Sequence, residues 1–290
     1  MSHIYEALER AERERSKTAS RPSEQMGQVD SSEALSAYSA PEWPAALEIA
    51  ENAWNPDEVF LPTLAERNQA IEQFRSLRSN LYQLRDEAEL KTIVISSALA
   101  AEGKTFLATN LALSLARNNE DGVLLIDADL RKPAIHQILK TSNSPGLSDY
   151  LSEQASLADL VQRNCSGDSS SQPGAKATSR LAFIPAGETA TGSHELVGNT
   201  RFEELIASVK PHFDWIIIDS PPVLLVTDAA DLARAADGVL LVARGGSTPF
   251  ESMQRAKASF SHARILGVVL NAVKHVPNNR SYYYYRDKTH

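Results

Sequence analysis

Cysteine is nearly absent from this chain: Cys165 is the only one among 290 residues. A single thiol cannot form a disulfide within the chain, which excludes the disulfide-stapled folds of small secreted proteins. Long apolar runs are missing as well, since none approaches the ~18 residues that a membrane-spanning helix needs. The first 15 residues carry too many charges for a signal peptide. We therefore expect a soluble, intracellular protein.

Positive charge is in deficit. The 29 Lys and Arg residues stand against 37 Asp and Glu, so the formal net charge is −8. This acidity disfavours a broad electropositive surface, and we expect no nucleic-acid partner. The hydrophobic share of 42% and the charged share of 23% are ordinary for a globular protein. The chain as a whole is therefore neither disordered nor fibrous.

The chain divides into segments of different character. Residues 1–16 have apolar side chains at helical spacing and predict an amphipathic helix. Residues 17–61 are rich in Ser, Ala, Pro and Glu without periodicity, which predicts a disordered linker. Residues 62–273 predict the folded domain, with a polar insertion at 165–180, and residues 274–290 predict a flexible, tyrosine-rich tail.

Short apolar runs alternate with helical stretches between residues 62 and 273. Most of the runs are continuously apolar, as in strands of a parallel sheet that is covered on both faces. The helical stretches would be the crossover connections. We therefore predict an α/β fold whose doubly wound, mainly parallel sheet is flanked by helices. The expected strands are 92–97, 123–127, 181–185, 215–219, 238–243 and 265–270, and the expected helices include 62–90, 105–117, 202–209 and 249–262.

The first predicted strand, TIVISS, leads into a phosphate-binding sequence. Gly103-Lys104-Thr105 follows this strand and opens a helix, which is the context of a phosphate loop. Backbone N–H groups there would point at phosphate oxygens. Lys104 would reach the β/γ-phosphates, and the Thr105 hydroxyl would bind Mg²⁺. Ala98 stands where the full motif G-x-x-x-x-G-K-[ST] has its first glycine.

Three carboxylates follow two of the other predicted strands. Asp127 and Asp129 alternate in VLLIDADLR, so both side chains point to the same side and could hold Mg²⁺ or accept a proton. Asp219 follows three isoleucines in IIIDSPP, as a Walker B carboxylate does. Carboxyl ends of parallel strands share one edge, so the acids and the phosphate loop should converge. An N-capping Asp with a solvated neighbour, and an ordinary strand-terminal Asp219, remain open alternatives.

Two further patterns concern the surface. A run of tyrosines in a locally basic C-terminal segment could reach about 60 Å when extended, far enough to meet an active site. An adhesive aromatic tail or a packed edge strand is the alternative. The tyrosines are Tyr282, Tyr283, Tyr284 and Tyr285. Separately, Glu72, Arg75 and Arg78 form one stripe of a predicted helix, which taken alone would be a solvated face.

Together these motifs resemble one family. The GKT loop, VLLIDADLR, IIIDSPP, the E-x-x-R-x-x-R helix and the tyrosine cluster are similar to those of the bacterial tyrosine kinases of polysaccharide export, or BY-kinases. The resemblance covers about residues 62–290. It implies a P-loop NTPase fold related to partition and nitrogenase-iron ATPases. It also implies ATP- and Mg²⁺-dependent autophosphorylation of the tyrosine cluster, mainly between subunits, which regulates exopolysaccharide or capsule polymerisation and export.

The resemblance also implies roles for individual residues. Lys104, Asp127, Asp129 and Asp219 would be catalytic, with Asp127 the favoured base for the tyrosine hydroxyl. The metal would be held by Thr105, Asp129 and Asp219. The nucleotide would contact Ala101, Glu102, Gly103, Lys104, Thr105, Phe106, Arg131 and Asn271. The subunit interface of a ring-shaped homo-oligomer would include Glu72, Arg75 and Arg78.

The resemblance extends to partners and location. Many relatives carry a fused transmembrane activator, which we do not find in this sequence. We therefore expect a cytoplasmic protein that a separate membrane chain-length-determinant protein recruits to the inner face of the membrane. A cognate tyrosine phosphatase is a further expected partner.

Two alternatives remain open. One is a partition or positioning-type P-loop ATPase that acts as a nucleotide-dependent dimer switch. Such proteins usually carry an additional lysine early in the phosphate loop, where this chain has Ala98 and Leu99. The other alternative is a non-catalytic regulatory subunit that only binds nucleotide, against which the complete set of acids argues.

Overall fold

The computed structural model describes most of the chain between residues 50 and 273. The expectations for residues 1–16 and for the tyrosine tail concern residues outside this part, as do those for most of the 165–180 insertion. The described residues are 50–52, 54–56, 60–64, 69–117, 121–164, 179–188 and 200–273.

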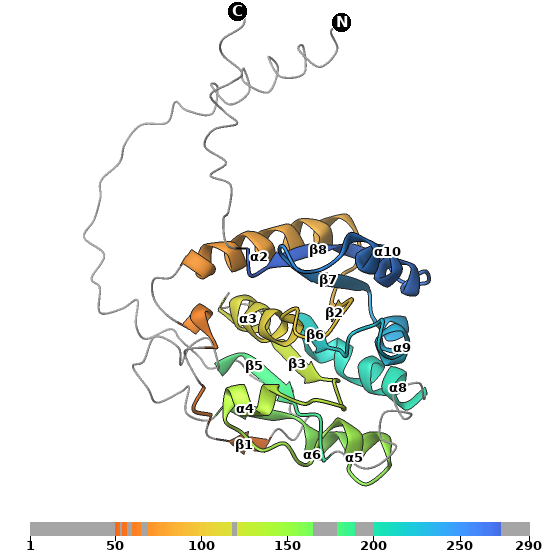
Figure 1. Cartoon of the computed structure of the whole chain (residues 1–290). Coiled ribbons are helices and arrows are strands. Elements are labelled where there is room, and N and C mark those ends of the chain that lie inside the picture. The colour runs from red at the N-terminus through yellow and green to blue at the C-terminus, as the bar shows by residue number, and fades with distance from the viewer. Residues whose placement is uncertain are drawn as a thin grey trace, which may run out of the picture. The chain divides into compact units, whose positions relative to one another are not determined.

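An eight-stranded sheet in the order β1-β4-β5-β3-β6-β2-β7-β8 forms the centre of the domain (Figure 1). All neighbouring strands are parallel except β4 and β5. The predicted mainly parallel α/β fold is therefore confirmed, with each predicted strand present to within one residue at its end. The strands are β1 (Ala50–Asn52), β2 (Thr92–Ser97), β3 (Val123–Asp127), β4 (Gln162–Asn164), β5 (Leu181–Ile184), β6 (Trp215–Asp219), β7 (Gly238–Arg244) and β8 (Ile265–Asn271).

Burial on both faces explains why the central strands are continuously apolar. In β2, Ile93 and Ile95 belong to one apolar cluster, whereas Val94 between them belongs to the other. Successive side chains of a strand point to opposite faces, so each face of the sheet has its own core. All three side chains are fully buried, so the strand is covered on both faces.

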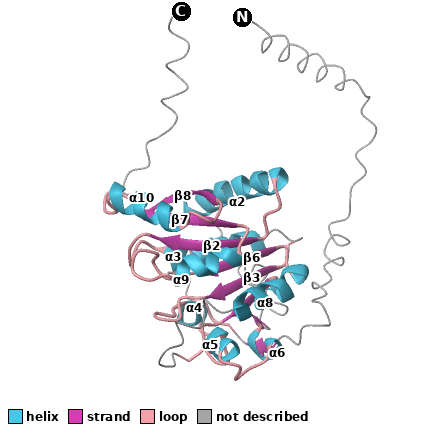
Figure 2. Cartoon of the chain, turned by 90° about the vertical axis from the view of Figure 1, so that its right-hand side faces the viewer, coloured by secondary structure: helices cyan, strands magenta, loops and turns pink. Residues whose placement is uncertain are grey.

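Helices form a layer on each face of the sheet (Figures 1 and 2). On one face lie α2 (Gln69–Glu87), α3 (Lys104–Ala116) and α4 (Ile135–Leu139), with the 3-10 turn Pro62–Leu64. On the other face lie α5 (Leu147–Leu151), α6 (Leu157–Leu160), α8 (Thr200–Val209), α9 (Asp228–Leu232) and α10 (Phe250–Ser259), with the 3-10 turns Lys210–His212 and Ala233–Ala235. In the described part of the chain, no helix is both long and apolar enough to cross a membrane.

The edge strand β1 and its neighbour β4 were not predicted. Each has three residues, AEN and QRN, and such short polar sequences carry no apolar pattern. β1 lies in the expected linker 17–61, and so do Trp54 and Leu61, which are buried in the core. The prediction that the folded domain begins at residue 62 is therefore wrong at its N-terminal boundary. It was wrong because these contacts are made with residues far along the chain.

The order of the strands directs three loops to one edge of the sheet. From β2 the chain crosses to β3, two places away, and from β6 it crosses over β2 to β7. Asp219 is in register with Asp127 on β3 and with Ile95 on β2. The loops that follow the parallel strands β2, β3 and β6 therefore begin side by side at the carboxyl edge of the sheet. Ligands bind at this edge in such sheets.

Asn110 of α3 ties the segment 60–64 to the domain. Its side-chain oxygen accepts hydrogen bonds from the hydroxyl and amide of Thr63, at 2.8 and 3.3 Å, and its amide donates to the carbonyl of Phe60. We expect Asn110→Leu to lower the free energy of unfolding by about 2–4 kcal/mol, because it leaves buried polar groups without partners. Urea denaturation measures this change. Glu87→Ala, on the exposed end of α2, is the control, and a loss for Asn110→Leu no larger than the control's would contradict the expectation.

Candidate phosphate and metal site

A strained loop joins β2 to α3. Ala101 and Gly103 both have positive φ values, 62° and 94°. A side chain at Gly103 would also meet the amide of Asn271, because an added Cβ would lie 1.9 Å from its nitrogen. Ala98 does not have a positive φ, so this loop conformation does not require the first glycine of the motif. The N–H groups at the start of α3 therefore open onto the site at the carboxyl edge of the sheet.

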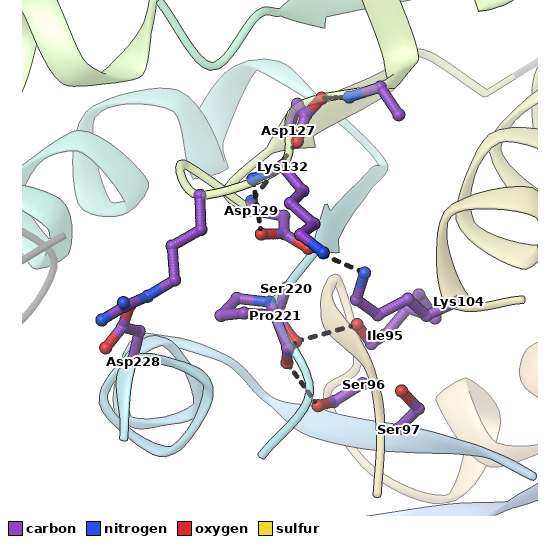
Figure 3. Close-up of polar contacts among 12 residues, drawn as sticks. Ile95, Ser96, Ser97, Lys104, Asp127, Asp129, Lys132, Ser220, Pro221 and Asp228 are labelled. Atoms are coloured by element: carbon purple, nitrogen blue, oxygen red, sulfur yellow. Dashed lines mark hydrogen bonds and ion pairs between the residues drawn. The ribbon is translucent and has the colours of Figure 1, made fainter. Parts of the chain in front are cut away.

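Lys104, the first residue of α3, reaches across the site to Asp129. Its ammonium forms an ion pair of 2.8 Å with the Asp129 carboxylate, and both side chains are largely buried (Figure 3). Burial alone would lower the pKa of Lys104, but the nearby carboxylates of Asp219 and Asp129 outweigh burial and raise it. Lys104 is therefore a firmly charged cation inside a cluster of acids.

Asp127 has a different environment from Asp129. One of its carboxylate oxygens accepts the N–H groups of Ala134 and Ile135, each at 3.1 Å, at the start of α4. The other accepts the N–H of Asp129 at 3.3 Å. Asp127 is not the N-cap of α4, which is Ala134, but its carboxylate accepts amides at the start of that helix from a distance along the chain. The alternative of an N-capping Asp also expected the neighbouring aspartate to face solvent. This is wrong, because Asp129 is only 3% exposed.

Asp219 is buried with no good hydrogen bond to its carboxylate. Neither carboxylate oxygen has a well-formed hydrogen bond. The Thr105 hydroxyl lies close enough to lower the pKa of Asp219 somewhat. Burial raises the pKa of Asp219 to about 6, against the attraction of Lys104. Burial, with the charge of Asp219 as the second cause, raises the pKa of Asp127 to about 8. The cluster therefore holds more negative charge than Lys104 offsets.

This arrangement fits Mg²⁺ bound together with phosphate. The two oxygens of Asp219 lack hydrogen-bond partners, and the Thr105 hydroxyl lies beside them. The Asp129 carboxylate, which is paired with Lys104, would be a further oxygen donor. Within the described ranges, no group of three or more His, Cys, Asp or Glu residues forms a metal cage of its own. Mg²⁺ commonly has few protein ligands and keeps waters and substrate phosphates, so the donors present suit that ion.

Other predicted contacts lie around the loop. The Asn271 amide donates to the carbonyl of Glu102 at 3.0 Å, which places the end of β8 against the loop. Arg131 is ion-paired with Asp228 of α9 at 3.3 Å, a partner that the sequence did not indicate. Phe106 contacts the ring of Phe74 on α2, with ring centroids 6.1 Å apart.

The stripe on α2 is only partly solvent-facing. Glu72 and Arg75 pair with each other at 2.6 Å on the surface, whereas Arg78 donates to the carbonyl of Ser114 on α3 at 2.6 Å. Burial lowers the pKa of Arg117, and the charges of Arg75 and Arg78 lower it further. Cationic groups therefore gather between α2 and the end of α3.

The serines around the site were missed by the sequence analysis. The Ser220 hydroxyl donates to the carbonyl of Ile95 at 3.0 Å, and the Ser96 hydroxyl donates to that of Pro221 at 3.2 Å (Figure 3). These contacts fasten the loop after β6 to β2. The only sequence signal for them is the position of both serines at strand ends.

The sequence and the fold of this chain are both similar to those of known proteins. A model of the AAA domain family matches residues 90–253. The putative tyrosine-protein kinase CapB of Staphylococcus aureus is 32% identical over 216 residues, which cover 74% of this chain and 89% of that protein. The kinase domain of the Escherichia coli tyrosine kinase ETK is 32% identical, with a TM-score of 0.63 over 73% of this chain and 78% of that one.

Other solved structures extend the comparison. The chimerical protein CapA2B2 is 27% identical, with a TM-score of 0.65 over 79% of this chain and 95% of that one. Cyanthece apo McdA, at 24% identity and a TM-score of 0.52, covers 63% of this chain and 72% of that one and shares the fold alone.

The raised pKa values predict how stability depends on pH. Between pH 4 and about pH 6 to 8, the unfolded chain has lost the protons of Asp127 and Asp219 while the folded chain keeps them, so stability falls as pH rises. We expect Asp219→Asn to be more stable than the wild type at pH 8, with a gain that shrinks towards pH 5. Urea denaturation at several pH values, without nucleotide or metal, measures this.

A control of opposite sign is present in the same sheet. Burial would raise the pKa of Asp237, but its hydrogen bond with Lys210 and those with the backbone of Lys91 and Thr92 lower it. Asp237→Asn should therefore destabilise the protein at neutral pH, and the loss should shrink only in acid. Equal pH slopes for the two variants would contradict this account of the site.

Proposed function

The chain belongs to the family of bacterial tyrosine-protein kinases, and from this premise we propose that it phosphorylates its own C-terminal tyrosine cluster with ATP, mainly between subunits. The observation that carries the proposal is the buried group of Lys104 and three aspartates beside the phosphate loop. Its charge suits a magnesium–triphosphate complex at the point where three parallel strands end.

The protein groups would act mainly by position and charge. Lys104 would leave Asp129 and bind the β/γ-phosphates, while the N–H groups at the start of α3 hold the remaining phosphate oxygens. Thr105, Asp129 and Asp219 would hold Mg²⁺. When bound, the ion would neutralise negative charge on the transferred phosphoryl group. The contacts to nucleotide from Arg131, Phe106 and Asn271 stay predictions.

The proton of the tyrosine hydroxyl needs an acceptor. The tyrosine oxygen forms the new bond to the γ-phosphorus, the bond from that phosphorus to the β/γ-bridging oxygen breaks, and ADP leaves. Asp127 is the proposed base: burial, with the charge of Asp219 as the second cause, raises its pKa, which makes the ionised carboxylate a stronger proton acceptor. Its hydrogen bonds to the amides of Ala134 and Ile135 would hold the carboxylate in place.

We also propose the assembly and its regulation. A ring of subunits would use Glu72, Arg75 and Arg78, and a separate membrane chain-length-determinant protein would recruit the cytoplasmic kinase and activate it. A cognate phosphatase would remove the phosphate groups from the tail tyrosines. Alternating phosphorylation and dephosphorylation would regulate exopolysaccharide or capsule export. The division into a linker before the domain and a tyrosine tail after residue 273 belongs to the same proposal.

Autophosphorylation is the direct test of the proposed activity. Incubation with Mg·ATP should give phosphotyrosine in the wild type, but none in Lys104→Met or in a variant with all four tail tyrosines changed to Phe. Mixing these two variants should restore the signal on the Lys104→Met chain, because its tail meets an active neighbour. Tyr150→Phe, in α5, is the control that keeps the signal. ATP hydrolysis without phosphotyrosine would instead support the positioning ATPase.

Phosphorylation should also loosen the oligomer. Each phosphotyrosine adds about −1.5 to −2 charges, so four add about −6 to −8. This change is as large as the chain's own net charge of −8. We expect the molar mass from light scattering to fall after complete phosphorylation. An unchanged mass would contradict this regulatory step while leaving the kinase activity intact.

A further inference from the structure

Glu102 is an unexpected residue in an anion-binding loop. It precedes the Gly103-Lys104-Thr105 sequence, where a carboxylate free to face the site would repel phosphate. The residue is only 3% exposed. One carboxylate oxygen accepts the N–H of Leu99 at 2.8 Å, and the other accepts the hydroxyl of Thr248. The side chain is therefore directed into the protein and used there.

Thr248 belongs to the connection between β7 and α10. Its hydroxyl accepts the N–H of Arg244 at 2.7 Å, and its own N–H donates to the Arg244 carbonyl at 3.0 Å. The hydroxyl is thus fixed by the end of β7 and has its proton free for Glu102. Two further bonds join the same regions, from Arg244 to the Ala101 carbonyl at 3.2 Å and from Asn271 to that of Glu102.

Hydrogen bonds rather than apolar packing connect the two segments. A cavity of about 260 Å³ lies between them, lined by Leu99, Ala101, Glu102, Arg244 and Thr248 among others. The hollow leaves part of the loop without apolar neighbours. The side chain of Glu102 lies in its wall and joins the N–H of Leu99 on the loop to the hydroxyl of Thr248.

The loop needs such support because its backbone is strained. The positive φ of Ala101 is disfavoured by about 1–2 kcal/mol for a residue with a Cβ atom. A loop free to relax would leave this conformation and turn its N–H groups away from the site. Charge-assisted hydrogen bonds to a buried carboxylate are among the stronger ones in proteins, so they can oppose that relaxation.

We infer that Glu102 is a positioning residue that preforms the phosphate loop by bridging Leu99 to Thr248. Its carboxylate serves the protein and contacts neither phosphate nor metal. The prediction that Glu102 binds nucleotide is thereby restricted to its backbone. The inference rests on the proposed function, since it concerns how tightly the same loop holds nucleotide.

Two substitutions at Glu102 separate position from charge. The amide of Glu102→Gln can accept the Leu99 N–H and donate to the Thr248 hydroxyl, which has a lone pair left, so the bridge survives without charge. Glu102→Ala removes the bridge. We expect the Kd of Mg·ADP to rise about tenfold or more in Glu102→Ala and to stay within about threefold of wild type in Glu102→Gln. The probe is a fluorescent ADP analogue bound to the full chain.

Substitutions at Thr248, the partner of Glu102, give a second test. Thr248→Val should raise the Kd of the same fluorescent ADP analogue, whereas Thr248→Ser keeps the hydroxyl and should leave this Kd unchanged. The loss in the double variant of Glu102→Ala and Thr248→Val should be smaller than the sum of the two single losses, because both substitutions break the same bond between Glu102 and Thr248. In turnover the KM for ATP should rise, with kcat at saturating ATP changed less than about threefold. A purely structural loss would reduce the fraction of active enzyme, so it would lower the apparent kcat and leave KM unchanged.

Each contrary result has a definite meaning. Equal damage by Glu102→Gln and Glu102→Ala would overturn the inference, because the charge itself would then matter. Additive effects in the double variant would overturn it too. If Glu102→Ala does not fold, the Thr248→Val and Thr248→Ser pair decides the matter. Absence of ADP binding by the wild type would instead overturn the proposed function and the inference with it.

Discussion

The concentration of buried negative charge around one lysine is the constraint on which the rest of this structure depends. Asp127, Asp129 and Asp219 are all at most 3% exposed, and Lys104 is the cation paired with them. Three carboxylates cannot all ionise in such a place at little cost, and burial accordingly raises the pKa of Asp219 and Asp127. A divalent cation relieves this excess, which is why the site favours a metal-bound nucleotide.

The fold is arranged to hold that charge in place. Continuously apolar strands, each covered by a helical layer, deliver Asp127 and Asp219 in register on adjacent strands. β2 on the other side of β6 delivers the phosphate loop. Helix α3 then begins at Lys104, so one turn of chain supplies both the lysine and the threonine of the site. The rigidity of the sheet keeps like charges close together.

Much of this could be predicted from the sequence, because the information is local. Apolar runs identified six of the eight strands, and the motifs at the ends of three of them identified Lys104 and the acids. The pairing within the cluster could not be predicted, since only the register decides that Asp129 faces Lys104 while Asp127 receives the α4 amides. The partner of Arg131 lies 97 residues away, and β1 and β4 are too short and polar to show a pattern.

The direction of a side chain is the part of the site that local patterns describe least. Glu102 is predicted by its neighbours to face phosphate and instead bonds to Leu99 and Thr248. Asn271 was expected near the nucleotide because it ends the last strand. It lies against Gly103, since the carboxyl ends of parallel strands share one edge of the sheet. Family membership describes the chemistry of such a loop, whereas these contacts describe what keeps it in shape.

The most direct test of the central claim is calorimetric titration of ATP with and without Mg²⁺, on the wild type and on Asp219→Asn. If the buried acids form the metal–nucleotide site, Mg²⁺ will tighten ATP binding about tenfold or more in the wild type, and much less in the variant. An ATP affinity that does not depend on Mg²⁺ in the wild type, or an equal dependence in both proteins, would contradict the account.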